Sequence, residues 1–223
     1  NLDALARAGI LFDDAITAAP LTLPSHCSLF TGTWPVFHGV RDNDGYVLDD
    51  AVTTLAETLK GHGFTTAAFV AAHPLSAQFN LDQGFDTYDD DFRADWTAEQ
   101  EEARTALSFG FLERRSDQVN VAVGRWLEAH ARDRFFLWVH YFDPHQPYDP
   151  PAPWDTRFLP PGDPGRPVRD ARTDLREPGD RERLVARYDG AVAYVDAQFG
   201  RLWRELQARG ELDEALVAFL ADH

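Results

Sequence analysis

The sequence has no methionine and only one cysteine, Cys27. A single cysteine cannot form a disulfide within the chain, so a disulfide-stapled fold is excluded and the redox compartment stays undecided. Lysine is almost absent too, because Lys60 is the only one and arginine supplies the rest of the basic charge. Long apolar runs are also missing, and we expect neither a signal peptide nor a membrane-spanning segment in residues 1–223.

Net positive charge is lacking as well, since the formal net charge is −16 at pH 7. A chain this acidic is repelled by nucleic acids and by anionic membranes, and we expect neither as a partner. Acidic residues crowd residues 82–102 without the alternating ligands of a calcium loop, so we interpret this stretch as a solvated face. Apolar side chains are plentiful, at 44% of 223 residues, which suffices for one core and predicts a single domain.

Helical and extended patterns alternate along the chain, which favours an α/β fold. The helical spacing of apolar residues predicts helices over residues 2–9, 52–61, 119–130 and 181–209. Short apolar runs predict strands over residues 10–12, 65–72, 135–142 and 216–220. The last three strands each follow a predicted helix, so we expect parallel strands with crossover connections. Residues 149–180 hold most of the prolines and are predicted to form an irregular excursion.

Titratable side chains follow these last three predicted strands. His73 comes after the first, His140 and His145 stand at the end of the second, and Asp222 with His223 stand at the end of the third. Because ligands of parallel sheets bind at the carboxyl ends of the strands, we expect these side chains to form one site.

The run over residues 20–32, Pro-Leu-Thr-Leu-Pro-Ser-His-Cys-Ser-Leu-Phe-Thr-Gly, places a small hydroxyl before a predicted helix. Pro24 suits the first helical position. Thr22, two residues earlier, would then face free backbone N–H groups and the positive end of the helix dipole, where a phosphate or sulfate binds well. His26, one turn beyond Thr22, could contact the same anion. Cys27 falls inside the helix, where we expect an ordinary buried thiol.

Asp222 and His223 form an acid–imidazole pair at the end of a predicted strand. Such a pair alone is more often a capping aspartate and a surface histidine, but beside Thr22 it favours a metal site. Aspartate with histidine suits zinc or manganese better than calcium. His140 or His145 could protonate a leaving alkoxide, and for His140 a core histidine satisfied by backbone is an equal alternative.

With these residues in hand, the chain resembles the sulfatase family of the alkaline phosphatase superfamily. The family's motif Cys/Ser-x-Pro-Ser-Arg-x-x-Leu-Leu-Thr-Gly matches the spacing from Thr22 to Gly32. Residues 135–148 resemble its Pro-His-x-Pro substrate-binding stretch, and residues 216–223 resemble the strand that ends in a metal-binding Asp-Asn or Asp-His pair.

The resemblance implies a three-layer α/β sandwich with a mostly parallel central sheet flanked by helices. Together with the chain ends at Asn1 and His223, it implies an incomplete segment that lacks the family's first strand, on which further acidic metal ligands are expected. Many members of the family are exported, which implies a periplasmic, secreted or membrane-attached protein. The oligomeric state is left open.

The resemblance also assigns roles to single residues. It implies Thr22 as the nucleophile and His145 as a catalytic, anion-binding histidine. A divalent metal ion would be held by Thr22, Asp222 and His223. We assign substrate binding to His26 (at the place of the motif arginine), His140 and His73.

One departure from the family bears on the substrate. Sulfatases convert the first Cys or Ser of the motif to formylglycine, which Thr22 cannot yield. Related members of the superfamily, nucleotide pyrophosphatases and lipoteichoic acid synthases, use an unmodified threonine on phosphoryl groups. We therefore expect a metal-dependent hydrolase of phosphate esters or diesters, ahead of sulfate esters, on a small molecule, glycan or lipid. The alternatives are a phosphotransferase of the lipoteichoic acid synthase type and an inactive, binding-only member.

Overall fold

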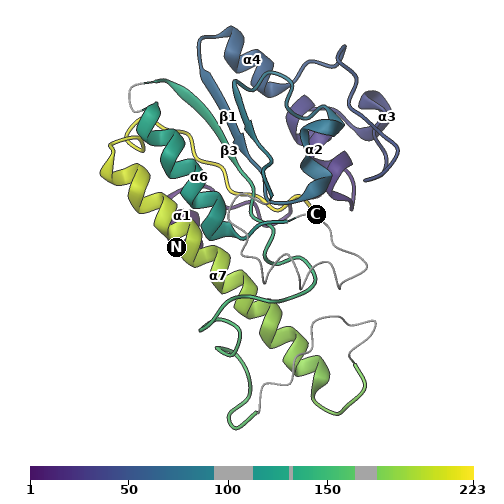
Figure 1. The fold of residues 1–223 in the computed structure, drawn as a ribbon, viewed down its shortest axis with the longest axis vertical. Coiled ribbons are helices and arrows are strands. Elements are labelled where there is room, and N and C mark those ends of the chain that lie inside the picture. The colour runs from purple at the N-terminus through teal and green to yellow at the C-terminus, as the bar shows by residue number, and fades with distance from the viewer. Residues whose placement is uncertain (93–112, 131–132, 164–174) are drawn as a thin grey trace. The chain divides into compact units, whose positions relative to one another are not determined.

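The fold is that of a computed structural model, drawn in Figure 1. It describes residues 1–92, 113–130, 133–163 and 175–223. Residues 93–102 of the acidic stretch and 164–174 of the predicted excursion therefore lie outside the described residues. The chain forms two compact units: a sheet unit (Phe12–His140 with Glu214–His223) and a helix unit (Asn1–Leu11 with Tyr141–Asp213). The single-domain expectation stays a prediction.

The sheet unit is built on a parallel sheet of the order β2–β1–β3. Its strands are β1 (Thr65–Phe69), β2 (Thr87–Asp89) and β3 (Phe135–Val139). The register of β1 and β3 runs from Thr65 opposite Phe135 to Phe69 opposite Val139. The α/β class and the parallel pairing of these two strands are thus confirmed. The short strand β2 was not predicted, because its Thr-Tyr-Asp sequence has no apolar run.

Helices cover both faces of this sheet (Figure 1). They are α2 (Thr22–Thr31), α3 (Pro35–His38), α4 (Leu55–Gly61) and α6 (Ser116–Ala129), with the 3-10 turns η1 (His73–Leu75) and η2 (Ala77–Phe79). The ring of Phe135 lies edge-on to Trp126 of α6, with centroids 5.6 Å apart. Trp138 lies edge-on to Phe30 of α2, at 4.8 Å. Phe135 and Trp138 are three positions apart on β3 and therefore point to opposite faces, which puts α6 on one face and α2 on the other.

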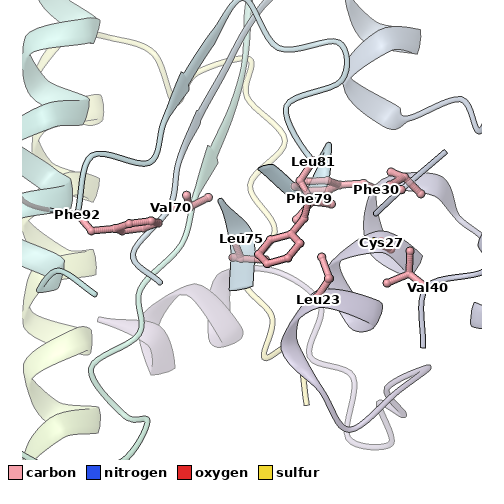
Figure 2. Close-up of a cluster of buried hydrophobic side chains, with 10 residues drawn as sticks. Leu23, Cys27, Phe30, Val40, Val70, Leu75, Phe79, Leu81 and Phe92 are labelled. Carbon is pink, nitrogen blue, oxygen red and sulfur yellow. The ribbon is translucent and has the colours of Figure 1, made fainter. Parts of the chain in front are cut away.

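The core of the sheet unit lies between α2 and the sheet (Figure 2). Its buried side chains are Leu23, Cys27, Phe30, Val40, Leu48, Val70, Leu75, Phe79, Leu81 and Phe92. Burying one large apolar side chain stabilises a fold by about 2 kcal/mol, so this cluster holds α2 firmly. Cys27 is fully buried within it, which confirms that the cysteine packs in the core.

The helix unit contains α1 (Leu2–Ala8) and the long α7 (Asp180–Ala208). The Leu2 amide donates to Asp196 Oδ1 of α7 at 2.8 Å. Gly200 of α7 lies so close to the Asn1 side chain that a β-carbon there would collide with it. Gly190 lies equally close to the backbone of Trp154. These helices confirm the predictions over residues 2–9 and 181–209. In the described part of the chain, no helix is long and apolar enough to cross a membrane.

Two predicted strands and one helix start are wrong. Residues 10–12 and 216–220 form no strand, and Ile10 and Leu216 are 83% and 98% exposed. A strand needs a hydrogen-bonded neighbour, and within the described residues neither segment joins a ladder. α4 begins at Leu55 instead of near residue 52, because Thr54 and Glu57 form a reciprocal capping box.

Candidate active site

Helix α2 begins at Thr22, two residues before the start predicted from Pro24. The preceding Leu21 is extended, with φ −142° and ψ 142°. Pro24 is accommodated inside the first turn because amides there have no partner within the helix, so its missing N–H costs nothing. Thr22 is thus a helical residue, only 4% exposed.

The first turn of α2 offers fewer donors than expected. The Leu23 amide donates to Asn43 Oδ1 at 2.9 Å, and the Ser25 amide donates to the Leu21 carbonyl at 3.1 Å. Pro24 has no N–H group. This leaves the Thr22 amide as the first-turn donor for which the described residues supply no acceptor. We expected several free N–H groups at the start of this helix. This was wrong, because the side chain of Asn43, 20 residues further along the chain, accepts the hydrogen bond of the Leu23 amide.

The Thr22 hydroxyl makes no hydrogen bond with any described residue. The Thr22 residue is largely buried, but its hydroxyl oxygen is not one of the fully buried unpaired atoms of the described residues. A hydroxyl with no partner among the described residues, at the positive end of a helix, is available to a ligand or to a reacting group.

His26 lies one turn beyond Thr22 and is 1% exposed. Its Nδ1 is 2.9 Å from the Thr22 carbonyl oxygen and 3.6 Å from Asp222 Oδ2. Because both oxygens accept, Nδ1 carries the proton and Nε2 is bare in the neutral ring. Burial lowers the pKa of His26, and the carboxylate of Asp222 opposes this in part. His26 therefore contacts the backbone of Thr22 as a neutral imidazole.

Asp222 is fastened to the first turns of α2 through its backbone. Its carbonyl oxygen accepts hydrogen bonds from Ser25 Oγ at 2.5 Å and from Thr17 Oγ1 at 2.6 Å. Its carboxylate lies 3.7 Å from Nε2 of His223. Ser25 thereby ties Asp222 to the helix. The structure thus brings Thr22, His26 and the Asp222–His223 pair together.

His140 follows β3 directly, and its ring lies edge-on to His26 with centroids 5.2 Å apart. The Ala71 amide donates to its Nδ1 at 3.2 Å, which leaves the proton of the neutral ring on Nε2. Burial, helped by the charges of His26 and Arg114, holds the pKa of His140 well below its ordinary value. His140 is therefore a neutral, core-facing histidine that also touches the site.

The other two predicted histidines have described contacts of their own. His73 begins η1, where the Gln78 side chain reaches its Nε2 at 2.6 Å and its ring lies edge-on to Phe79. No described contact joins His73 to Thr22. His145 belongs to the helix unit, where its ring stacks on Phe142 at 4.3 Å and its Nδ1 lies 2.7 Å from the Gln146 carbonyl oxygen.

Two further residues act at this end of the sheet. Asn43 supplies the acceptor for α2, and Arg114, 6% exposed, ties two strand ends. Its Nε donates to the Val70 carbonyl at 3.0 Å, and its Nη1 lies 2.9 Å from Asp89 Oδ1. Arg114 was missed, because these partners lie far away in the sequence and leave no local pattern.

The predicted metal ligands can be compared with the structure. Within the described residues, no three His, Cys, Asp or Glu side chains gather as ligands. The carboxylate of Asp222 and the imidazole of His223 lie close together, and the carbonyl oxygen of Asp222 is bonded to Ser25 in the helix that begins at Thr22. Such oxygen and nitrogen donors are of the kind that zinc or manganese prefers.

Comparisons with known proteins agree with this geometry. A family model described as sulfatase matches residues 1–223. The ulvan-active sulfatase of Formosa agariphila is 26% identical over 239 residues, covering 100% of this chain and 45% of that protein. The N-sulphoglucosamine sulphohydrolase of Homo sapiens is 27% identical over 259 residues, with the same 100% and 45% coverage. The chain thus spans less than half the length of these curated relatives.

Solved structures show the same fold. The phosphonate monoester hydrolase of Agrobacterium radiobacter superposes with a TM-score of 0.71 at 19% identity. The superposition covers 96% of this chain and 55% of that one. The superposed part of that enzyme therefore has the same arrangement of sheet and helices as this chain.

Proposed function

The chain belongs to the sulfatase family, and we propose that it carries the nucleophile and part of the metal site of an ester hydrolase that acts on a phosphodiester. The supporting observation is the hydroxyl of the largely buried Thr22, for which the described residues supply no partner, on the helical turn that also carries His26, with Asp222 tied to that turn through Ser25. A nucleophile beside a carboxylate and imidazoles is the arrangement that covalent hydrolysis requires.

The reaction is a double displacement. Thr22 Oγ attacks phosphorus, the bond from phosphorus to the leaving oxygen breaks, and water then cleaves the threonyl ester and restores the hydroxyl. The α2 N-terminus, with the unpartnered Thr22 amide, favours the negative charge of the ester. The roles of His145 as proton donor and of His140 and His73 in substrate binding stay predictions from the sequence.

Members of the family generally depend on a metal ion. We propose that Asp222, His223 and Thr22 hold a divalent ion, with zinc or manganese preferred over calcium. When bound, such an ion lowers the pKa of a nearby hydroxyl and neutralises charge on the ester. The contribution of the chain itself is to hold Asp222 in place through its carbonyl oxygen, as Ser25 and Thr17 do.

Two features favour a phosphodiester. Threonine carries a methyl group on its β-carbon, so its oxidation would give a ketone and not the formylglycine aldehyde on which sulfate hydrolysis depends in the family. His26 stands where the motif has an arginine and is neutral through burial. A neutral imidazole stabilises a dianion less than a guanidinium does, so a singly charged diester suits this turn better than a phosphate monoester.

The names of two relatives, an ulvan-active sulfatase and an N-sulphoglucosamine sulphohydrolase, support a glycan as the carrier of the ester group. We therefore propose a phosphodiester linked to a sugar as the natural substrate.

The test is a panel of three probes given to the full-length protein: a bis-aryl phosphate, an aryl phosphate and an aryl sulfate, each with zinc, manganese or calcium. We expect the diester to be cleaved fastest, with zinc or manganese. Faster cleavage of the aryl sulfate would overturn the diester preference. A protein that binds the metal but cleaves none of the probes is a binding-only member. Transfer of the aryl phosphate group from the diester to an added alcohol, in place of its release as free aryl phosphate, identifies a phosphotransferase.

A further inference from the structure

His38 is a buried histidine that the proposed reaction does not use. It ends α3 and is 4% exposed. The Val40 amide donates to its Nδ1 at 3.2 Å, and its Nε2 lies 3.0 Å from Ser28 Oγ. Ser28 Oγ itself donates to the Pro24 carbonyl oxygen at 3.0 Å.

The donor and the acceptor of each of these three hydrogen bonds can be assigned. An amide N–H can only donate, so His38 Nδ1 accepts from Val40. A carbonyl oxygen can only accept, so the Ser28 proton points at Pro24 and the Ser28 oxygen accepts from His38 Nε2. His38 is thus a neutral ring with its proton on Nε2, and burial, which lowers its pKa, keeps it so.

The contacts of His38 lead to the turn that carries Thr22. Ser28 lies one turn beyond Pro24 on α2, and Val40 is fully buried in the cluster that contains Cys27 (Figure 2). Three residues after Val40, the side chain of Asn43 accepts the Leu23 amide. Residues 38–43 therefore contact α2 at two points, Ser28 and Leu23, and His38 joins the two through Val40.

We propose that His38 is a positioning residue for the nucleophile. Its Nδ1 fixes the Val40 amide, which sets the loop so that Asn43 holds the Leu23 amide and, with it, the backbone of Thr22. Its Nε2 fastens the ring to α2 through Ser28. The inference rests on the proposed function for its effect on catalysis, whereas its structural part concerns the Leu23 amide alone.

Two variants of His38 separate its two contacts. In His38→Gln the side-chain NH2 group can replace Nε2 toward Ser28, while the acceptor for Val40 is lost. In His38→Asn the side-chain oxygen can replace Nδ1 toward Val40, while the donor to Ser28 is lost. We expect His38→Gln to lower kcat on the best probe about tenfold (about 1.4 kcal/mol) with KM unchanged, because the buried N–H group of Val40 is left without an acceptor. His38→Asn is the matched control, with kcat within about threefold of the parent.

A double-mutant cycle with Asn43→Ala tests the route. If His38 acts through Asn43, His38→Gln has no further effect on kcat once Asn43 is replaced. Effects that multiply in full would show that His38 contributes only general stability, and an unchanged kcat in His38→Gln would overturn the proposal.

Amide hydrogen exchange of the full chain gives a readout that needs no substrate. We expect exchange at Leu23 to accelerate in His38→Gln about tenfold and to stay near the parent rate in His38→Asn. Unchanged exchange at Leu23 in a folded His38→Gln protein contradicts the positioning role, whatever the activity. Accelerated exchange in a protein that cleaves no probe supports the positioning role and rejects the proposed function.

Discussion

The hydroxyl of Ser25 donates a hydrogen bond of 2.5 Å to the carbonyl oxygen of Asp222, across 197 positions of sequence. This bond joins the segment that contains Asp222 to the helix that begins at Thr22. It acts on the backbone of Asp222, so the carboxylate stays available to a ligand.

Replacing Ser25 should therefore weaken metal binding. We expect Ser25→Ala to lower the affinity for zinc or manganese about tenfold, because the carbonyl of Asp222 loses a donor and the carboxylate loses its fixed position. Isothermal titration with each ion measures the effect. Thr31→Ala is the matched control, since among the described residues Thr31 Oγ1 bonds to the Cys27 carbonyl of its own helix and to Thr33. Equal affinities in both variants would show that Ser25 does not position Asp222.

Removing the Thr22 hydroxyl should abolish turnover. Thr22→Val keeps the shape of this buried side chain and replaces the hydroxyl by a methyl group. We expect kcat/KM on the bis-aryl phosphate to fall by at least about 10³-fold, while the melting temperature changes little. Thr22→Ser, which keeps a hydroxyl, should retain activity within about tenfold. Near-normal turnover by Thr22→Val would exclude Thr22 as the nucleophile.

The thiol of Cys27 should be chemically silent. Burial raises its pKa to about 12, so almost no thiolate is present at neutral pH. We expect a thiol reagent to label the folded protein only at the rate of unfolding, and to label it at once in denaturant. Cys27→Ala should keep kcat and lose about 1 kcal/mol of stability through the small cavity it leaves. Loss of kcat in a folded Cys27→Ala protein would contradict this and would indicate that the Cys27 thiol takes part in the reaction.

Acid should destabilise the protein through three buried histidines. His26, His38 and His140 all have a pKa below the ordinary 6.5 when folded. As the pH falls through 6.5, the unfolded chain binds protons that the folded chain does not, so the free energy of unfolding decreases. Asp222 opposes this at His26, and Arg114 adds to it at His140.

The measurement is the melting temperature between about pH 7.5 and about pH 5. We expect a steady fall, and a shallower one in His38→Asn, which has one titrating group fewer. His62→Ala is the control, because His62 is exposed and its loss should leave the slope unchanged. A melting temperature that rises on acidification would contradict the buried neutral state of these rings.

The parts of the fold that sequence could predict are those fixed by local pattern. β1 and β3 are apolar runs, the first mostly buried and the second half-buried, and α7 repeats apolar residues at helical spacing, so each carries its own signal. Residues 216–220 carry the same apolar signal but form no strand, since pairing depends on a neighbour that the pattern does not contain.

The site divides in the same way. The grouping of Thr22 with Asp222 and His223 follows from a motif and from the rule that ligands gather at strand ends. The hydrogen bond of His26 to the Thr22 carbonyl and that of the Leu23 amide to Asn43 depend on which acceptor the tertiary fold places next to each donor. Contacts between residues far apart in the sequence produce no recognisable sequence pattern. For the same reason, the sequence did not predict that the helix begins at Thr22 and not at Pro24.

The two close approaches to α7, at Gly190 and Gly200, bear on how freely this helix can vary. Substitutions at exposed positions of a helix usually change stability little. At Gly190 even an alanine side chain would collide with the backbone of Trp154, and at Gly200 it would collide with the side chain of Asn1. Descendants of this sequence should therefore be recognisable by a pair of glycines ten positions apart, kept inside a helix that would otherwise favour alanine.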